Sequence, residues 1–247
     1  MKQDIVDQVR AAGGEIYAIT SEPQHLANQA HEDWGLTFEN VGDPHQEISQ
    51  VCSERGWLTL YANRGDTEFL QRGAEWKVEH PKGYFQPGVL AITNEHRLLY
   101  RWRSVPSEAN LHGTLARPTA THVWNAVQEA LSAGDTAADA ALDDDPVIDA
   151  APPPRALFIA ALLANGWFIR VKSLVYSPGV EVGPSRWPKI LSRWLVFIAF
   201  WAIALWLLPA VVVGLGFAAW LAWVVRDTKR VMGKLQLQKE LVADKPS

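Results

Sequence analysis

Hydrophobic and polar positions follow two different patterns along the chain. From residue 1 to about 133, short apolar runs alternate with segments in which apolar residues recur every three or four positions. After residue 155 the chain is almost continuously apolar, with many tryptophans and with basic residues at its edges. The first pattern is typical of a sheet with crossover helices, and the second of helices at or in a membrane. The sequence therefore predicts a soluble α/β domain (1–133) and a membrane-associated helical region (155–247).

Within the first region, the apolar runs predict four strands, and the last two have the spacing of a hairpin. The predicted strands are EIYAIT (15–20), LTFENV (36–41), GVLAIT (88–93) and RLLYRWR (97–103). Segments with helical periodicity lie before, between and after these strands. The predicted helices lie in MKQDIVDQVRAAGG (1–14), PQHLANQAHEDWG (23–35), HQEISQVCSERG (45–56) and RPTATHVWNAVQEAL (117–131).

The longest apolar run, between Arg193 and Arg226, has no charged residue at any of its 32 positions. One straight helix of this length would be roughly 48 Å long, whereas the hydrocarbon core of a bilayer is about 30 Å thick. Pro209 lies near the middle, and a break there gives two arms of about 16 residues, slightly short for spanning. We therefore predict a membrane hairpin (about 190–226), either re-entrant or barely spanning. A single tilted, kinked helix is the alternative.

Basic residues flank this run on both sides, and tryptophans recur along it. Positive residues beside membrane segments favour the cytoplasmic side, so basic flanks at both ends place both ends of a hairpin there. The flanking basic residues are Arg186, Lys189, Arg193, Arg226, Lys229, Arg230 and Lys234. The tryptophans predicted to anchor the hairpin at the interface are Trp187, Trp194, Trp201, Trp220 and Trp223. A pigment or quinone site among these rings is the less favoured interpretation.

A shorter apolar segment (about 156–172) ends in Arg170 and Lys172. Its apolar stretch of about 14 residues suits an interfacial helix better than a membrane span. These features predict the lipid bilayer as a partner and attachment to the inner (cytoplasmic) membrane. The N-terminal stretch has no apolar signal-peptide core, so we expect the soluble domain to face the cytoplasm.

The stretch GDTAADAALDDDPVIDAAPPPR separates the two regions. It contains six aspartates, many small residues and three consecutive prolines, and it can bury little apolar surface. We therefore predict a linker (134–154) that is the most mobile internal segment and the first to be cut by proteases. Its run of Asp143, Asp144 and Asp145 is interpreted as solvated rather than as a cation site.

Net charge, cysteine count and histidine spacing exclude several kinds of partner and site. The net charge of −4 gives no reason to expect a nucleic-acid partner. A single cysteine excludes an internal disulfide. His80, His96 and His112 lie without metal-ligand spacing, so we predict no metal site and no cofactor.

The stretches GGEIYAITSEPQHLANQAHEDWGLTFENVGDPHQEIS and QPGVLAITNEHRLLYRWR run in the order strand, helix, short strand, Asp-Pro turn and later hairpin. In this order they resemble the AhpC/TSA family, the peroxiredoxin-like branch of the thioredoxin fold, from about Ile5 to Leu131. The resemblance implies a thioredoxin-like mixed sheet with flanking helices. It also implies a cis peptide bond at Pro87 and marks Pro87 and Arg117 as remnants of the family's active site. An ordinary strand-opening proline is the alternative for Pro87.

The chain departs from this family at the reactive centre. The family's nucleophilic cysteine follows a first strand, where a helix N-terminus stabilises the thiolate, and neither is present in this sequence. Without that strand, a gap of roughly 10 Å, two strand spacings, would separate residues 15–19 from 88–92. Either these strands close up, or the stretch WLTLYAN (57–63) fills the gap, or the natural chain begins upstream of Met1 with the missing cysteine.

Cys52 cannot take that catalytic role by position. It lies inside the predicted helix 45–56, on one face with Ile48 and Val51. We therefore predict a packing residue whose burial raises the pKa of the thiol, an effect that Arg55 alone would not offset.

Two functions remain. The favoured one is a membrane-attached thioredoxin-like protein without a catalytic cysteine, which acts as a binding or assembly module for a membrane or protein partner. The alternative is a redox enzyme, a thiol peroxidase or oxidoreductase of antioxidant type. Its cysteine-bearing N-terminal segment would be missing from this sequence, and Cys52 would be only a weak catalytic candidate.

Overall fold

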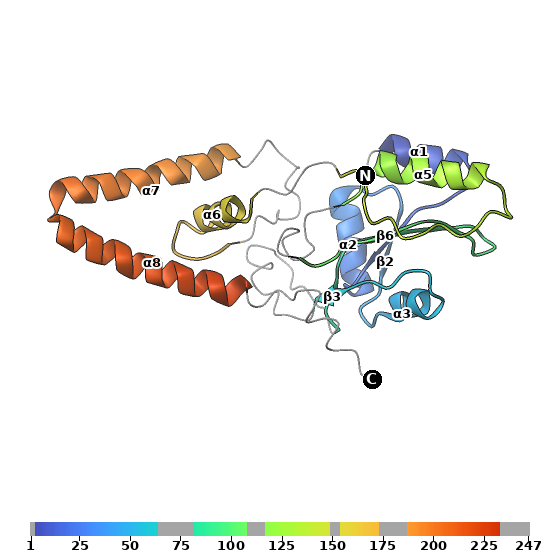
Figure 1. Cartoon of the computed structure of the whole chain (residues 1–247), viewed down its shortest axis with the longest axis horizontal. Coiled ribbons are helices and arrows are strands. Elements are labelled where there is room, and N and C mark those ends of the chain that lie inside the picture. The colour runs from blue at the N-terminus through green and yellow to red at the C-terminus, as the bar shows by residue number, and fades with distance from the viewer. Residues whose placement is uncertain (1–2, 64–81, 108–116, 149–153, 173–186, 233–247) are drawn as a thin grey trace. The chain divides into compact units, whose positions relative to one another are not determined.

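The computed structural model describes residues 3–63, 82–107, 117–148, 154–172 and 187–232. These residues form two compact units, one up to residue 148 and the other from residue 154 onward. The first unit contains helices and short strands, and the second contains helices only (Figure 1).

The first unit contains the predicted elements in the predicted order. Its helices are α1 (Gln3–Ala11), α2 (Gln24–Trp34), α3 (Glu47–Glu54) and α5 (Ala120–Ser132). Its strands are β1 (Tyr17–Thr20), β2 (Glu39–Gly42), β3 (Ala62–Asn63), β4 (Tyr84–Phe85), β5 (Gly88–Ile92) and β6 (Leu98–Arg103). The predicted hairpin is confirmed as β5–β6. The two-residue strands β3 and β4 are too short to leave a hydrophobic pattern.

The strands form three separate two-stranded sheets rather than one continuous sheet. β1 pairs with β2 in parallel, whereas β3–β4 and β5–β6 are antiparallel pairs. β1 and β5 do not pair with each other, so these two strands have not closed up. The first unit thus combines helices with small sheets, as predicted. A thioredoxin-like arrangement of these elements remains a proposal.

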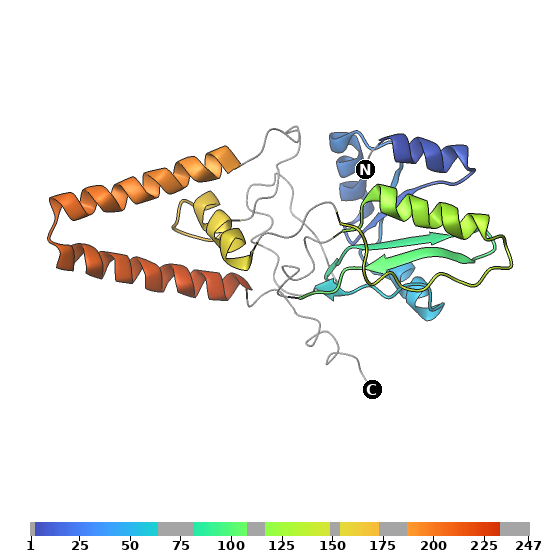
Figure 2. The ribbon, with the colours of Figure 1, turned by 45° about the horizontal axis from the view of Figure 1, so that its top comes forward.

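The core of the first unit lies on one face of the β5–β6 hairpin. Tyr100 and Trp102 of β6 pack against Trp124 and Val127 of α5 and against Ile5 of α1. α1 and α5 cover this face side by side, as Figures 1 and 2 show. The indole N–H of Trp124 donates to the Gln8 side chain at 2.9 Å, which joins the two helices by a polar contact as well.

The opposite face of the hairpin is crossed by WLTLYAN (57–63), the stretch that one of the three alternatives placed in the gap. Side chains alternate between the two faces of a strand, so Arg101 and Arg103 point away from the core. Arg101 Nη1 donates to the carbonyl oxygen of Gly56 at 3.1 Å, and Arg103 Nη1 donates to that of Thr59 at 3.0 Å. WLTLYAN therefore lies across the face of β6 and ends in β3, and it pairs with neither β1 nor β5.

Pro87 directly precedes β5 and has a trans peptide bond, so the predicted cis bond is wrong. Its carbonyl oxygen accepts a hydrogen bond from Ser104 N–H at 2.7 Å. A proline donates no ladder bond and is tolerated at the first position of a strand. The strand-opening alternative accounts for this residue.

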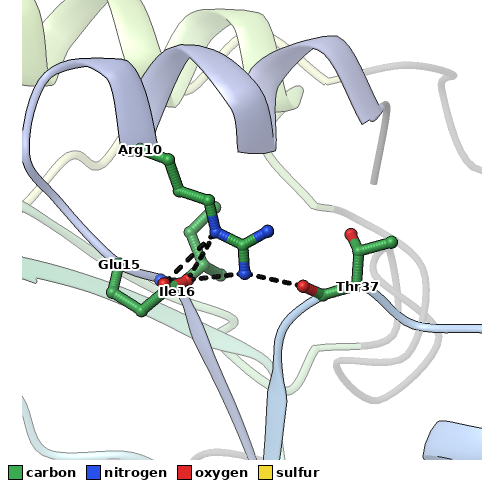
Figure 3. A network of polar contacts seen from close by, with 4 residues as sticks. All are labelled: Arg10, Glu15, Ile16 and Thr37. Carbon is green, nitrogen blue, oxygen red and sulfur yellow. Dashed lines mark hydrogen bonds and ion pairs between the residues drawn. The ribbon is translucent and has the colours of Figure 1, made fainter.

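A surface ion pair fixes the start of β1 beneath α1 (Figure 3). Arg10 forms two hydrogen bonds to Glu15 Oε1, at 3.2 and 3.0 Å, and its Nη2 also donates to the carbonyl oxygen of Thr37 at 2.6 Å. Glu15 in turn accepts from Ile16 N–H at 2.9 Å. The hydrogen bond from Arg10, followed by that from Ile16, lowers the pKa of Glu15. One arginine thereby connects the segments that lead into β1 and β2.

The acidic stretch, predicted to be a free linker, is bonded to the first unit over its described part, 134–148. The Asp139 carboxylate accepts from Leu98 N–H, and Ala140 N–H donates to the carbonyl oxygen of Leu98. The Asp143 N–H donates to the carbonyl oxygen of Arg101 at 2.9 Å. The Asp143 carboxylate accepts from the Tyr100 hydroxyl at 2.7 Å and lies 2.8 Å from His122 Nε2. The prediction of a solvated aspartate run is therefore wrong for Asp143.

The second unit consists of three helices, α6 (Arg155–Asn165), α7 (Trp187–Leu207) and α8 (Ala210–Met232). α7 and α8 are joined at Leu208 and Pro209, run in opposite chain directions and splay apart from this turn (Figures 1 and 2). The predicted hairpin is confirmed, and the single kinked helix is wrong. The arms have 21 and 23 residues and are longer than predicted, because both helices continue into their basic flanks. α6 ends at Asn165, earlier than the predicted 172, and a turn follows it.

We predict that Asp143→Asn destabilises the first unit by about 1–3 kcal/mol at pH 6, since hydrogen bonds to a charged group are lost. Desolvation raises the pKa of Asp143, but hydrogen bonds from His122, Tyr100 and Asp145 N–H outweigh it and leave that pKa lowered. A lowered folded pKa contributes stability that is present above the unfolded value of about 4 and is lost as pH falls through the folded value. Urea unfolding followed by near-ultraviolet circular dichroism should therefore show a difference that shrinks below about pH 4.

The matched control is Asp144→Asn, an identical change at the neighbouring exposed residue. It should leave the urea midpoint unchanged over the same pH range. Equal effects of the two substitutions would contradict a specific role of Asp143.

Candidate functional site

The largest uncovered apolar surface of the described chain lies on α7 and α8. Two segments, Pro188–Leu207 and Ala210–Val231, are long and apolar enough to cross a membrane. Their side chains are largely uncovered: Trp206 is 84% exposed, Val211 75% and Leu215 68%. Helices of 21 and 23 residues are roughly 32 and 35 Å long, enough for a hydrocarbon core of about 30 Å. The predicted length of about 16 residues for each arm, either re-entrant or barely spanning, is therefore too short.

Aromatic side chains join the two arms of the hairpin on their inner side. The rings of Phe197 and Trp220 lie 4.8 Å apart between centroids, and those of Trp201 and Phe217 lie 5.1 Å apart in an edge-to-face arrangement. Phe168, from the turn after α6, stacks on Phe197 at 4.1 Å. Edge-to-face and offset ring pairs are favourable beyond their buried area. The cluster therefore packs α7, α8 and the turn against one another.

The turn after α6 has a costly backbone conformation. Trp167 and Phe168 both have positive φ, 55° and 58°, and residues other than glycine rarely adopt such values. Two indoles of α8 hold this turn: Trp220 donates to the carbonyl oxygen of Phe168 at 2.7 Å, and Trp223 donates to that of Ile169 at 2.8 Å. These hydrogen bonds attach the carbonyl groups of the turn to the middle of α8.

Charged side chains add contacts closer to the open end of the hairpin. Arg193 Nη1 donates to the carbonyl oxygen and to the side-chain oxygen of Asn165, both at 2.9 Å, at the C-terminus of α6. Its guanidinium lies 4.9 Å from the ring centre of Trp167. Asp227 of α8 accepts from Val171 N–H at 2.7 Å. A cation at a helix C-terminus is favourable because the carbonyl groups there carry partial negative charge.

The predicted anchoring residues occupy several different positions. Trp194, Trp201 and Trp220 are half-buried within or beside the aromatic cluster, whereas Trp223 is 58% exposed. Trp187 begins α7, but its side chain lies outside the described ones, and Arg226 is exposed. Trp206, the most exposed large apolar residue, was missed. Its place three residues before Pro209, at the turn of the hairpin, was the available signal.

Cys52 is half-buried near the C-terminal end of α3, and its predicted packing face is not buried. Ile48 and Val51 are 36% and 45% exposed, so the prediction that they turn Cys52 toward an apolar core is wrong. The raised pKa of the thiol is nevertheless confirmed in direction. Desolvation is the main cause, the Asp43 carboxylate adds to it, and Arg55 opposes both.

The N-terminus of α3, which could stabilise a thiolate, is occupied by Asp43. This buried carboxylate accepts from Glu47 N–H at 2.7 Å and from Ser49 N–H at 3.1 Å. Cys52 lies beyond it, where the helix dipole favours cations rather than a thiolate. The local electrostatics around Cys52 therefore disfavour a reactive thiol.

The other predicted site residues do not assemble a recognisable centre in the described part of the chain. Arg117 is exposed and precedes Thr119, whose side chain caps α5 by accepting from His122 N–H at 3.0 Å. His96 stacks on Trp57 with ring centres 5.3 Å apart, whereas His80 and His112 lie outside the described residues. Among the described residues, no group of His, Cys, Asp and Glu has a geometry that could hold a metal ion.

We predict that Gly166→Ala loosens the turn after α6. A Cβ at Gly166 would overlap the carbonyl oxygen of Arg170, and overpacking of this kind costs about 1–3 kcal/mol. Thermal unfolding in detergent should occur at a lower temperature, and the fluorescence of Trp220 and Trp223 should change as their hydrogen bonds break.

Gly214→Ala is the matched control in the same unit. No heavy atom lies within 4 Å of a Cβ placed there, and alanine favours the helix by about 1 kcal/mol over glycine. The unfolding temperature should stay equal or rise. The same temperature for Gly166→Ala as for the unsubstituted chain would contradict the described turn.

Comparisons with protein-family models, with curated proteins and with solved structures find no match for this chain. The AhpC/TSA resemblance therefore rests on the two sequence stretches alone.

Proposed function

We propose that the protein attaches to the cytoplasmic membrane through the α7–α8 hairpin and acts there as a binding or assembly module. Its soluble unit would be of thioredoxin-like, AhpC/TSA type without a catalytic cysteine. The observation that carries the proposal is the large apolar surface of α7 and α8 that α6 and the turn after it leave exposed. Exposed apolar surface of this extent is costly in water and favourable in lipid.

The charge distribution supports the proposed side of the membrane. Lys189 and Arg193 lie near the start of α7, and Arg226, Lys229 and Arg230 lie near the end of α8. Because the two helices are antiparallel arms, these residues share the open end of the hairpin. Basic residues beside membrane segments favour the cytoplasmic side.

The environment of Cys52 supports a binding function over a thiol enzyme. A peroxidatic cysteine needs an ionised, accessible thiol. Here burial and the Asp43 carboxylate both raise the pKa of the thiol. The thiol peroxidase or oxidoreductase alternative would need a cysteine that this sequence does not contain.

We predict that the full chain stays in the membrane pellet after extraction with high salt and with carbonate. Leu215→Lys should move a substantial fraction into the supernatant, because a lysine in the hydrocarbon core costs about 2.5–3.5 kcal/mol. Val147→Lys is the matched control, an exposed apolar residue of the first unit, and should leave the pellet fraction unchanged.

The same preparations test the topology. In inside-out vesicles, protease should remove the C-terminal tail, because both ends of the hairpin are proposed to face the cytoplasm. Release of the unsubstituted chain by carbonate would refute insertion, and a protected tail would refute the hairpin topology.

We predict that Cys52 is not rapidly oxidised to a sulfenic acid by stoichiometric peroxide and that the purified chain has no thiol-coupled peroxidase turnover. Cys52→Ser should cost on the order of 1 kcal/mol of stability or less, because the site is only half-buried, and should leave membrane attachment intact. Mass spectrometry of the treated protein and a coupled turnover assay provide the measurements. Turnover that disappears in Cys52→Ser would establish the enzymatic alternative.

A further inference from the structure

Two of the strand edges in the first unit are closed by other parts of the chain. At the outer edge of β2, the Gln24 side chain donates to the carbonyl oxygen of Asn40 at 2.9 Å and accepts from Gly42 N–H at 2.8 Å. At the outer edge of β6, Asp139 accepts from Leu98 N–H at 2.8 Å, and residues 140–143 bond the carbonyl oxygens of Leu98 and Arg101. These contacts provide the partners that an added strand would otherwise supply.

The opposite edges, on β1 and β5, are open. Thr20 of β1 accepts from Asp43 N–H beyond the end of β2, so the amide and carbonyl groups of Thr20 and Ala18 face β2. Those of Tyr17 and Ile19 must therefore face the other way. No hydrogen bond joins these groups to any described residue.

The same alternation applies to β5. Pro87 accepts from Ser104 N–H, so the groups of Val89 face β6, whereas those of Gly88 and Leu90 face away from it. These outward groups also have no hydrogen-bond partner among the described residues. β1 and β5 lie in one compact unit but do not pair with each other.

Neither open edge carries a charged side chain or an internal proline, two of the features by which proteins block strand addition, although β1 is short and β5 has a register irregularity at Ala91 and Ile92. The sequences of β1 (YAIT) and β5 (GVLAI) contain no charged residue and no internal proline. Tyr17 and Ile19 are 60% and 46% exposed, so apolar side chains accompany the unpaired backbone groups. Charged or proline-bearing edges are the usual protection against pairing with another chain.

We propose that the open edges of β1 and β5 bind an extended, uncharged segment of a partner protein as an added β-strand. An extended backbone offers the matching row of N–H and C=O groups, and uncharged side chains suit Tyr17 and Ile19. A second copy of this chain that paired through β1 would cover one open edge and leave the other open. This inference rests on the proposed binding function and names its class of partner.

The test is residue-resolved amide hydrogen exchange on the full chain in detergent micelles. Without a ligand, the amides of Tyr17, Ile19 and Leu90 should exchange fast, whereas those of Ala18 and Thr20, which donate to β2, should exchange slowly. The probe is the synthetic peptide KVTVITVK at millimolar concentration. It should slow exchange of the outward amides by about tenfold or more and leave the inward ones unchanged.

Two matched controls distinguish strand pairing from non-specific binding of the peptide. A peptide of the same sequence with N-methyl groups on alternate residues keeps the side chains but loses one row of N–H donors, and it should give much weaker protection. Ile19→Pro removes an outward N–H and should weaken peptide binding, whereas Ile19→Thr keeps that N–H and should bind. Slow exchange at Ala18 and Thr20 shows whether each variant has kept its fold, and the comparison of the two peptides does not depend on the variants.

Three results would overturn the proposal. Slow exchange of the outward amides without peptide, at every protein concentration, would mean that the chain covers these edges itself. Protection that grows with protein concentration alone would assign the edge to a second copy. Unchanged exchange at millimolar peptide would mean that the edges do not accept a strand. Release from membranes by carbonate would instead contradict the proposed attachment and leave the exchange result intact.

Discussion

Backbone N–H and C=O groups that leave water need hydrogen-bond partners, and this requirement shapes both units of the chain. In the second unit, most backbone N–H and C=O groups of α7 and α8 are paired within each helix. The turn after α6 also needs hydrogen bonds from other elements. Its carbonyl groups at Phe168 and Ile169 accept from the indoles of Trp220 and Trp223. Arg193 donates to the carbonyl oxygen of Asn165 at the C-terminus of α6. Residues that a hydropathy pattern identifies as membrane anchors therefore also hold the irregular backbone of the turn after α6.

The same requirement distinguishes the strand edges of the first unit. Gln24 and the acidic stretch from Asp139 to Asp143 provide hydrogen-bond partners along the outer edges of β2 and β6. The edges of β1 and β5 lack such partners among the described residues, although both strands are short, uncharged and apolar. An exposed apolar hairpin and an open strand edge on one chain are consistent with the proposed function, in which the protein would bring an extended segment of another protein to a membrane surface.

The position of Cys52 illustrates how reactivity depends on place rather than on residue type. A thiolate is stabilised at a helix N-terminus, and that end of α3 is occupied by the Asp43 carboxylate. At the other end of the helix the backbone dipole, the burial and the same carboxylate all favour the neutral thiol. Arg55 acts in the opposite direction, but it is exposed and is the smallest of the three contributions to the pKa.

Hydrophobic periodicity alone determined the order of the main helices and strands, and the uncharged run with Pro209 at its centre determined the hairpin. These features are local, because a strand alternates every two residues and a proline interrupts a helix whatever surrounds it. Only the tertiary structure decided which face of a helix is buried, and it left Ile48 and Val51 of α3 exposed. The attachment of the acidic stretch to β6 was also decided there. Asp139 and Asp143 can form their hydrogen bonds only once the fold has brought Leu98 N–H, Tyr100 and His122 close to them. Which strand edges are closed was likewise beyond the sequence, since it depends on contacts between segments that are distant along the chain.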